Sequence, residues 1–253
     1  MAAVNGYAGK IATEIADAPL LNAALNLCGV SAIVWFAIGT LFIISHEGSA
    51  HSQAQPYDKA AIGLTMLFSF VPLNFAGAIG LLLCGAYLAG TSAKWSVERR
   101  IAIVIIALTG PLIWGRFLLA LFGPFILKLD ASLAAHLAGV QVEGNVVKLR
   151  DGSGSLYVAL GCSSVHNMSL AILLFVTLVQ FLALRCTPLL LLTAAGATLA
   201  MAAVNVMRLA TLARFPQYFD LVHTGWAGTA FGALSFVAAG AIIARGIHAE
   251  LSR

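Results

Sequence analysis

The sequence predicts an all-α polytopic membrane protein with about six transmembrane helices and a small β-rich extracytoplasmic segment between the third and fourth helices. Three observations support this prediction. Of the 253 residues, 60% are hydrophobic and only 9% are charged, against about 25% charged in an ordinary soluble domain. The apolar residues are gathered into long runs. One stretch of alternating apolar and polar residues separates the third run from the fourth. A single membrane domain over residues 1–253 is expected.

Charge and cysteine content exclude several other classes of protein. The 14 Lys and Arg residues against 10 Asp and Glu leave a net charge of +4 that is small and dispersed, which argues against a nucleic-acid partner. The four cysteines, at positions 28, 84, 162 and 186, have neither the number nor the spacing of a disulfide framework or a zinc site. No metal ion and no other cofactor is therefore expected.

Each apolar run is long enough, or nearly so, to cross a bilayer, which takes about 20 residues of helix. The second run contains Pro72, and as one helix it would exceed a hydrocarbon core of about 30 Å, so it must tilt, kink or protrude. The first run follows Lys10, Glu14 and Asp17 without a small-residue cleavage site, which predicts an anchor that is not removed. The runs cover residues 20–44, 60–90, 101–127, 163–184, 188–212 and 223–245.

The short loop between the second and third runs sets the expected orientation. It contains Lys94, Arg99 and Arg100, and basic loops stay on the cytoplasmic side. With six spans, both termini are then cytoplasmic and the chain lies in the cytoplasmic membrane, with lipid as a partner. The segment at about residues 128–161 falls on the outer side. Its alternating valines and leucines, separated by Glu143-Gly144-Asn145 and Asp151-Gly152-Ser153-Gly154, predict a hairpin or three-stranded meander.

On this topology three reactive side chains reach the outer ends of the predicted catalytic helices, at about residues 162–245. Cys162 begins the fourth helix, where the positive end of the helix dipole and a nearby cation favour a thiolate. Arg208 lies about one turn inside the end of the fifth helix, where an ionised side chain needs a partner or a wet cavity. Asn205 precedes it by one turn on the same face. His223 begins the last helix, and the convergence of three runs on one face favours a functional site.

Other assignments of these residues stay open on spacing alone. His166 follows Cys162 by four residues on the same helical face, so it competes with His223 as the base. Arg116 is a second intramembrane charge that contributes either to the site or to helix packing. Cys162, His166 and His223 lack the paired spacings of a metal site. Packing roles suit two further sets: the other three cysteines, and Gly228 with Gly232, a Gly-x-x-x-Gly pair typical of a close helix contact.

A non-enzymatic membrane protein is the alternative of a different class. A transporter, or an assembly factor for exported polymers, would use Arg116 and Arg208 to line a path for an anionic solute. Such a role should survive Cys162→Ala, whereas a cysteine enzyme should lose turnover by several orders of magnitude.

The residues resemble the exosortase/archaeosortase family of membrane transpeptidases over about residues 110–245. The likeness lies in Cys162-Ser163 after a β-like outer segment, Asn205-Val206-Met207-Arg208 near the end of the next helix, and His223 at the start of the last. The family commonly has Cys-Ser-Gly or a close variant, whereas this chain has Ser at position 164. The resemblance implies that Cys162, Arg208 and His223 carry the reaction, and it gives His166 no such role.

The resemblance also implies a substrate class. Members recognise exported proteins that end in a short sorting motif, a transmembrane helix and a basic tail. They cleave near the motif through a thioester and transfer the new C-terminus to an envelope acceptor. An active site on the extracytoplasmic face is expected, with Asn205, Arg116, His166 and Ser163 as candidates for supporting or substrate-binding roles.

Overall fold

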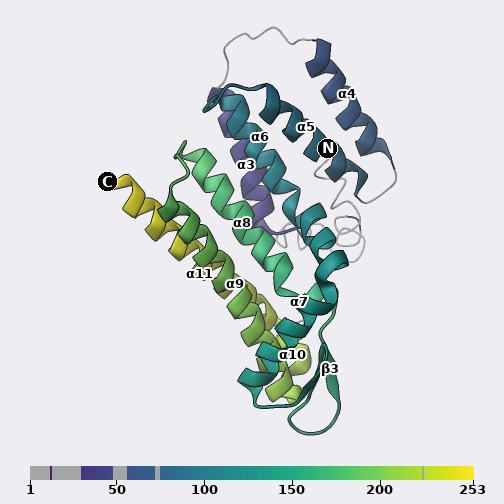
Figure 1. Ribbon diagram of the computed structural model, residues 1–253. Coiled ribbons are helices and arrows are strands. Elements are labelled where there is room, and N and C mark those ends of the chain that lie inside the picture. Colours follow the sequence, from purple (N-terminus) through teal and green to yellow (C-terminus); the bar gives the residue numbers. More distant parts are fainter. Residues whose placement is uncertain (1–11, 13–29, 48–55, 72–74, 224) are drawn as a thin grey trace. The chain divides into compact units, whose positions relative to one another are not determined.

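The computed structural model describes residue 12 and residues 30–47, 56–71, 75–223 and 225–253 (Figure 1). These residues divide into two compact units. The first contains the described residues up to Trp114 together with Leu173–Arg185, and the second contains Gly115–Ile172 and Cys186–Arg253. Every candidate site residue belongs to the second unit. Cys28 and the first part of the predicted 20–44 span lie outside the described residues.

The first unit is a set of short helices packed on one another. Helix α4 (Pro56–Phe70) packs on α5 (Ala76–Thr91), and α6 (Val97–Leu108) packs on both α5 and α3 (Ala32–Glu47). The C-terminal half of α8 (Ser164–Phe181) completes the unit. Arg100 joins these elements. It pairs with Glu47 at 2.7 Å and donates to the carbonyls of Gln180 and Phe181 at 2.8 and 3.1 Å, which satisfies the open end of α8.

The run over residues 60–90, expected to tilt, kink or protrude, forms two helices. Helix α4 ends at Phe70, two residues before Pro72. Proline lacks the amide hydrogen that a helix needs and disfavours the helical conformation in the residue before it. The two helices pack closely where Gly80 faces α4, since an added Cβ there would lie 2.9 Å from the Cβ atom of Phe68.

Four described helices are long and apolar enough to cross a membrane, which supports a helical membrane protein. They are Phe117–Ala138 within α7 (Gly115–Ala138), α8, α9 (Pro188–Arg214) and α11 (Trp226–Leu251). Helices α3 and α5 are apolar but have only 16 residues each, about 24 Å of helix against a core of about 30 Å. The described residues therefore do not confirm the prediction of six full-length spans.

The segment between α7 and α8 begins later than predicted. Helix α7 continues through residue 128 to Ala138, so only residues 139–163 lie outside these two α-helices. The predicted three-stranded meander is confirmed: β1 (Val142–Glu143), β2 (Val146–Lys148) and β3 (Ser155–Tyr157) pair antiparallel in that order. Gly144 and Gly152 occupy the two turns with φ of 61° and 75°, a conformation that glycine adopts without strain.

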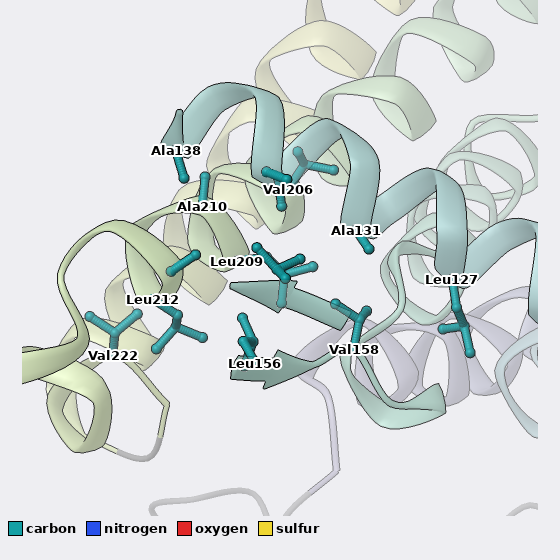
Figure 2. Packing of buried hydrophobic residues seen from close by; sticks show 14 residues of the cluster. Leu127, Ala131, Ala138, Leu156, Val158, Val206, Leu209, Ala210, Leu212 and Val222 are labelled. Atoms are coloured by element: carbon teal, nitrogen blue, oxygen red, sulfur yellow. The ribbon is translucent and has the colours of Figure 1, made fainter. Parts of the chain in front are cut away.

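One apolar cluster ties this meander to the helices of the second unit (Figure 2). Val147 of β2 and Leu156 of β3 turn inward, opposite each other in the strand register. They pack with the alanine face of α7, with α9 between Val206 and Ala213, and with Val222 of α10 (Phe219–His223). Cys162 and Phe219 are partly buried against the same cluster. The cluster therefore supports the segments that carry the candidate site.

Candidate active site

Cys162 lies just before α8 and not within it, which corrects the predicted position at the head of the helix. Residues Leu160–Cys162 form a 3₁₀ turn, in which the Cys162 amide donates to the Ala159 carbonyl at 2.9 Å. Ser163 is extended, with φ −70° and ψ 146°, and α8 begins at Ser164. The cause is a helix cap, because the Ser163 hydroxyl accepts a hydrogen bond from the Val165 amide at 3.2 Å. Ser163, a supporting candidate, is thus a capping residue.

A buried carboxylate holds the first residue of α8. Asp130, on α7, is only 5% exposed. Its Oδ2 atom accepts from the Ser164 amide at 2.9 Å, and its Oδ1 atom accepts from the Ser164 hydroxyl at 2.7 Å. A negative charge at a helix N-terminus is stabilised by the helix dipole. Asp130 therefore supports the start of α8, directly after the segment that carries Cys162.

Asn205 connects α9 to the segment that carries Cys162. Its Nδ2 atom donates to the Cys162 carbonyl at 2.9 Å and to the Ser164 hydroxyl oxygen at 3.3 Å. Its Oδ1 atom accepts from Asn167 Nδ2, also at 3.3 Å. Asn205 is buried, so these bonds replace those it would make with water. The prediction that Asn205 supports the site thus has a geometric basis.

Arg208, one turn further along α9, holds the end of α10. Its Nε atom donates to the Val222 carbonyl at 3.4 Å, and its Nη2 atom donates to the His223 carbonyl at 3.2 Å. An arginine that binds the last carbonyls of a helix satisfies acceptors the helix leaves open. The Nη1 atom has no hydrogen-bond partner among the described residues, so part of the guanidinium remains available to a ligand.

His223 ends α10, whereas the sequence predicted that it begins the last helix. The chain turns after it, with the Gly225 amide donating to the Asp220 carbonyl at 2.8 Å, and α11 starts at Trp226. The imidazole is exposed and stacks on the Phe219 ring, with centroids 5.1 Å apart and the planes 11° from parallel. An exposed ring on a firm aromatic support is accessible to a bound peptide.

Helix α9 carries Arg208 and contacts the backbone of the other two predicted catalytic residues, Cys162 and His223. Asn205 binds the Cys162 carbonyl, and Arg208 binds the His223 carbonyl. Within the described part of the chain, no hydrogen bond joins the side chains of Cys162, Arg208 and His223 to one another. The thiol is free, partly buried and without a hydrogen-bond partner there, which leaves it open to react.

The remaining candidates stand further from these contacts. His166 is exposed on the first turn of α8, and its carbonyl accepts from the Ser169 hydroxyl at 2.7 Å. Arg116 belongs to the first turn of α7, and its side chain lies outside what the structure describes. Among the described residues, no three His, Cys, Asp or Glu side chains are grouped so that they could hold a metal ion.

No protein-family model matches the chain, and neither does any curated protein or solved structure. The chemistry of the site is therefore argued from its own residues. It contains a free thiol on a tightly held turn, a cation with unused donors, and an accessible imidazole.

Sequence reasoning missed Asp130 and Asn167, and it noted Ser164 only as a departure from the family pattern. The available signal was the carboxylate of Asp130 at the end of an apolar run. A charge there is costly unless it is paired, so a buried partner could have been expected. The identity of that partner, 34 residues away, depends on how α7 packs against the start of α8.

Proposed function

We propose that this chain is a membrane-embedded cysteine transpeptidase or protease that cleaves the C-terminal sorting signals of exported proteins. The observation that carries the proposal is the role of α9. That helix holds the backbone of a free cysteine through Asn205 and, one turn later, holds the backbone of an exposed histidine through Arg208. A nucleophile, a cation and a proton carrier are the groups that acyl transfer requires.

The proposed reaction has two steps. In the first, the Cys162 thiol gives its proton to His223, and the thiolate attacks the scissile carbonyl carbon, forming a C–S bond and an oxyanion. Arg208 stabilises that oxyanion with the guanidinium N–H groups that do not bind the carbonyls of α10. The C–N bond then breaks as His223 returns the proton to the leaving amine. Arg208 itself stays protonated, so the histidine must carry the proton.

In the second step, an acceptor amine of the envelope, or water, attacks the thioester. His223 takes the proton of this nucleophile while the C–S bond breaks, and the proton then restores the Cys162 thiol. Amide bonds are cleaved and re-formed without net oxidation, so the chain needs no redox partner. The exposed position of His223 suits a group that must meet both a leaving and an incoming amine.

The proposed orientation places the site on the extracytoplasmic face of the cytoplasmic membrane, with both termini cytoplasmic. Basic residues gather at the far end of α8, where Arg100 binds the Phe181 carbonyl and Arg185 lies 5.4 Å over the Trp95 ring. Cys162 lies two residues before Ser164, the first residue of this 18-residue helix. Since basic ends stay in the cytoplasm, this arrangement supports an outward-facing Cys162.

The proposal is tested by trapping the thioester. The full chain is co-expressed with exported proteins that end in a transmembrane helix and a basic tail, and intact mass reports adducts and cleavage. Wild type and Cys84→Ala, which removes another partly buried free thiol, should form the adduct and the cleaved product. Cys162→Ala should lose turnover by about three orders of magnitude or more. A cognate substrate processed equally by Cys162→Ala would overturn the proposal and favour a transport or assembly role.

The same assay decides between the two histidines. His223→Ala should lower turnover by about a hundredfold or more, the usual contribution of a positioned acid or base. If His166→Ala has that effect and His223→Ala does not, the proton carrier has been assigned to the wrong residue. His248→Ala, exposed in the last turn of α11, serves as the control.

A further inference from the structure

Asp130 is the one buried carboxylate in the described residues of the second unit, and it makes an unusual pair of contacts. Both of its oxygens accept from a single residue, Ser164, through the amide and the hydroxyl. It forms no ion pair with another described residue. A buried carboxylate is costly and cannot contribute to solubility, so we expect Asp130 to have another role.

The carboxylate determines the direction of a chain of hydrogen bonds. An ionised carboxylate can only accept, so the single hydrogen of the Ser164 hydroxyl points to Asp130. The Ser164 oxygen must then accept from its other neighbour, which is Asn205 Nδ2. With its NH₂ group turned this way, Asn205 also donates to the Cys162 carbonyl, and its Oδ1 atom accepts from Asn167. Each contact has the polarity that the carboxylate requires.

We propose that Asp130 is the positioning residue for Cys162. By fixing the hydroxyl of Ser164, it selects the orientation of Asn205 that holds the Cys162 backbone where the thiol meets a substrate carbonyl. The inference rests on the proposed function insofar as Cys162 is the nucleophile. Asp130 acts through Ser164 and Asn205 and does not touch the reacting atoms.

The variant Asp130→Asn separates polarity from size. An asparagine at this position can donate to the Ser164 oxygen, which frees the hydroxyl hydrogen to point to Asn205. The side-chain amide of Asn205 can then accept a hydrogen bond by turning its oxygen to that hydrogen. In this orientation its NH₂ group no longer donates to the Cys162 carbonyl. Ser164→Ala removes the link itself. Ser235→Ala is a matched control, because Ser235 is equally buried on α11 and its hydroxyl donates only to the Phe231 carbonyl of its own helix.

The test measures two properties of the full-length chain in lipid nanodiscs. The first is turnover of a sorting-signal substrate, separated into kcat and KM. The second is the rate at which iodoacetamide alkylates Cys162 between pH 6 and pH 9, in a background where the other three cysteines are alanine. Asp130→Asn and Ser164→Ala should each lower kcat by about tenfold to a hundredfold, as expected for a misplaced reacting group, with KM within about twofold. Both should alter the alkylation profile alike, and Ser235→Ala should leave it unchanged.

The double variant gives the decisive comparison. If Asp130 acts through Ser164, adding Asp130→Asn to Ser164→Ala should change kcat by less than about twofold, because the two substitutions break the same series of hydrogen bonds. Effects that multiply, or an Asp130→Asn variant that matches Ser235→Ala, would overturn the inference. Should Asp130→Asn fail to fold, Ser164→Ala with an unchanged alkylation profile also overturns it. Alkylation needs no substrate, so a chain that turns over nothing would refute the proposed function while this inference is still tested.

Discussion

At the level of single residues, the Cys162 carbonyl accepts a hydrogen bond from the protein, whereas its thiol makes none among the described residues. Asn205 binds the carbonyl at 2.9 Å, while the sulfur has no hydrogen-bond partner among the described residues. A fixed backbone with an unengaged thiol suits a nucleophile, because the geometry of attack is set without a contact that must first be broken. The cation nearest this arrangement along α9 is Arg208, whose own position depends on two backbone carbonyls.

Arg208→Lys tests whether the arginine is needed for its shape as well as its charge. The guanidinium binds the carbonyls of Val222 and His223 and still has Nη1 for a substrate. A lysine keeps the charge but cannot reproduce the fork. Turnover in the thioester assay should fall by about a hundredfold, the effect of losing one oxyanion donor.

Arg214→Lys is the matched control for this substitution. Arg214 lies on the same helix and also donates to a carbonyl, that of Ala138 at 3.2 Å, but it is exposed. Its replacement should leave turnover within about twofold of wild type, as usual for a surface substitution. Equal losses in the two variants would show that the effect is not specific to the guanidinium of Arg208, because both substitutions keep the positive charge.

Among the secondary-structure elements, α11 meets α10 at a glycine. The Gly228 and Gly232 pair is expected to mark a helix–helix contact, and this is confirmed for Gly228, which faces α10, but not for Gly232. A Cβ added at Gly228 would lie 2.7 Å from the Val222 oxygen and 3.3 Å from the His223 oxygen, the two atoms that Arg208 binds. Nothing lies within 4 Å of a Cβ added at Gly232. Gly228 therefore lets α11 approach the anchoring carbonyls of the site.

Gly228→Ala should lower turnover because the new methyl group displaces those carbonyls and, with them, the guanidinium of Arg208. We expect a loss of about tenfold to a hundredfold in the thioester assay. Gly232→Ala, one turn further along the same helix, should retain activity and should not lower the Tm, since alanine favours helix over glycine. Similar activity in both alanine variants would remove Gly228 from the support of the site.

Helices α9 and α11 are held together by a second close approach. A Cβ at Gly246 would clash with the Oγ1 atom of Thr193, whose hydroxyl donates to the Leu189 carbonyl at 2.9 Å. Gly246→Ala should therefore lower the free energy of unfolding by about 1–3 kcal/mol, as overpacking usually does. Thermal unfolding in detergent measures this effect.

Two further variants show whether the clash is the cause. Gly240→Ala places a methyl group where nothing lies within 4 Å, so its Tm should stay at or above that of wild type. Thr193→Ala should restore part of the stability of Gly246→Ala, because it removes the two nearest atoms, Oγ1 and Cγ2, and leaves only the Cβ atom of residue 193 at 2.8 Å. Additive losses in the double variant would show that the two residues do not act on each other.

For the whole molecule, the decisive property is which ends of the helices face outward. The proposed orientation predicts that a membrane-impermeant maleimide reaches residue 153 from outside and residue 186 from inside. Both positions are exposed, at the turn between β2 and β3 and at the connection between α8 and α9. The test uses sealed right-side-out and inside-out vesicles carrying single-cysteine chains, Ser153→Cys in a cysteine-free background and native Cys186 alone.

Labelling of Cys186 in right-side-out vesicles and of position 153 in inside-out vesicles would reverse the topology. A site for exported substrates would then be untenable, because Cys162 would face the cytoplasm. Labelling of both positions after detergent is added provides the control for reactivity. This experiment needs no substrate, so it tests the orientation separately from the chemistry.

Local patterns were sufficient for much of this fold. Long apolar runs predict membrane helices because each helix satisfies its own backbone hydrogen bonds, and this holds for the stretches that became α7, α8, α9 and α11. Alternation with glycine turns predicts the three strands because register and turn type are short-range properties. The order Cys162, Asn205, Arg208, His223 likewise directed attention to one unit of the chain.

Other features required the packed chain. The sequence shows Ser163 and Ser164 in an apolar context, but only their cap and the partner carboxylate of Asp130 make α8 begin after Cys162. Helix ends are decided by which groups satisfy the first amides, and here those groups are the Asp130 carboxylate of α7 and the Ser163 hydroxyl. Asn205 likewise gains its role from Cys162, 43 residues before it. Composition and periodicity thus predict which segments are helical, whereas contacts between distant residues determine where the helices end and which side chains meet.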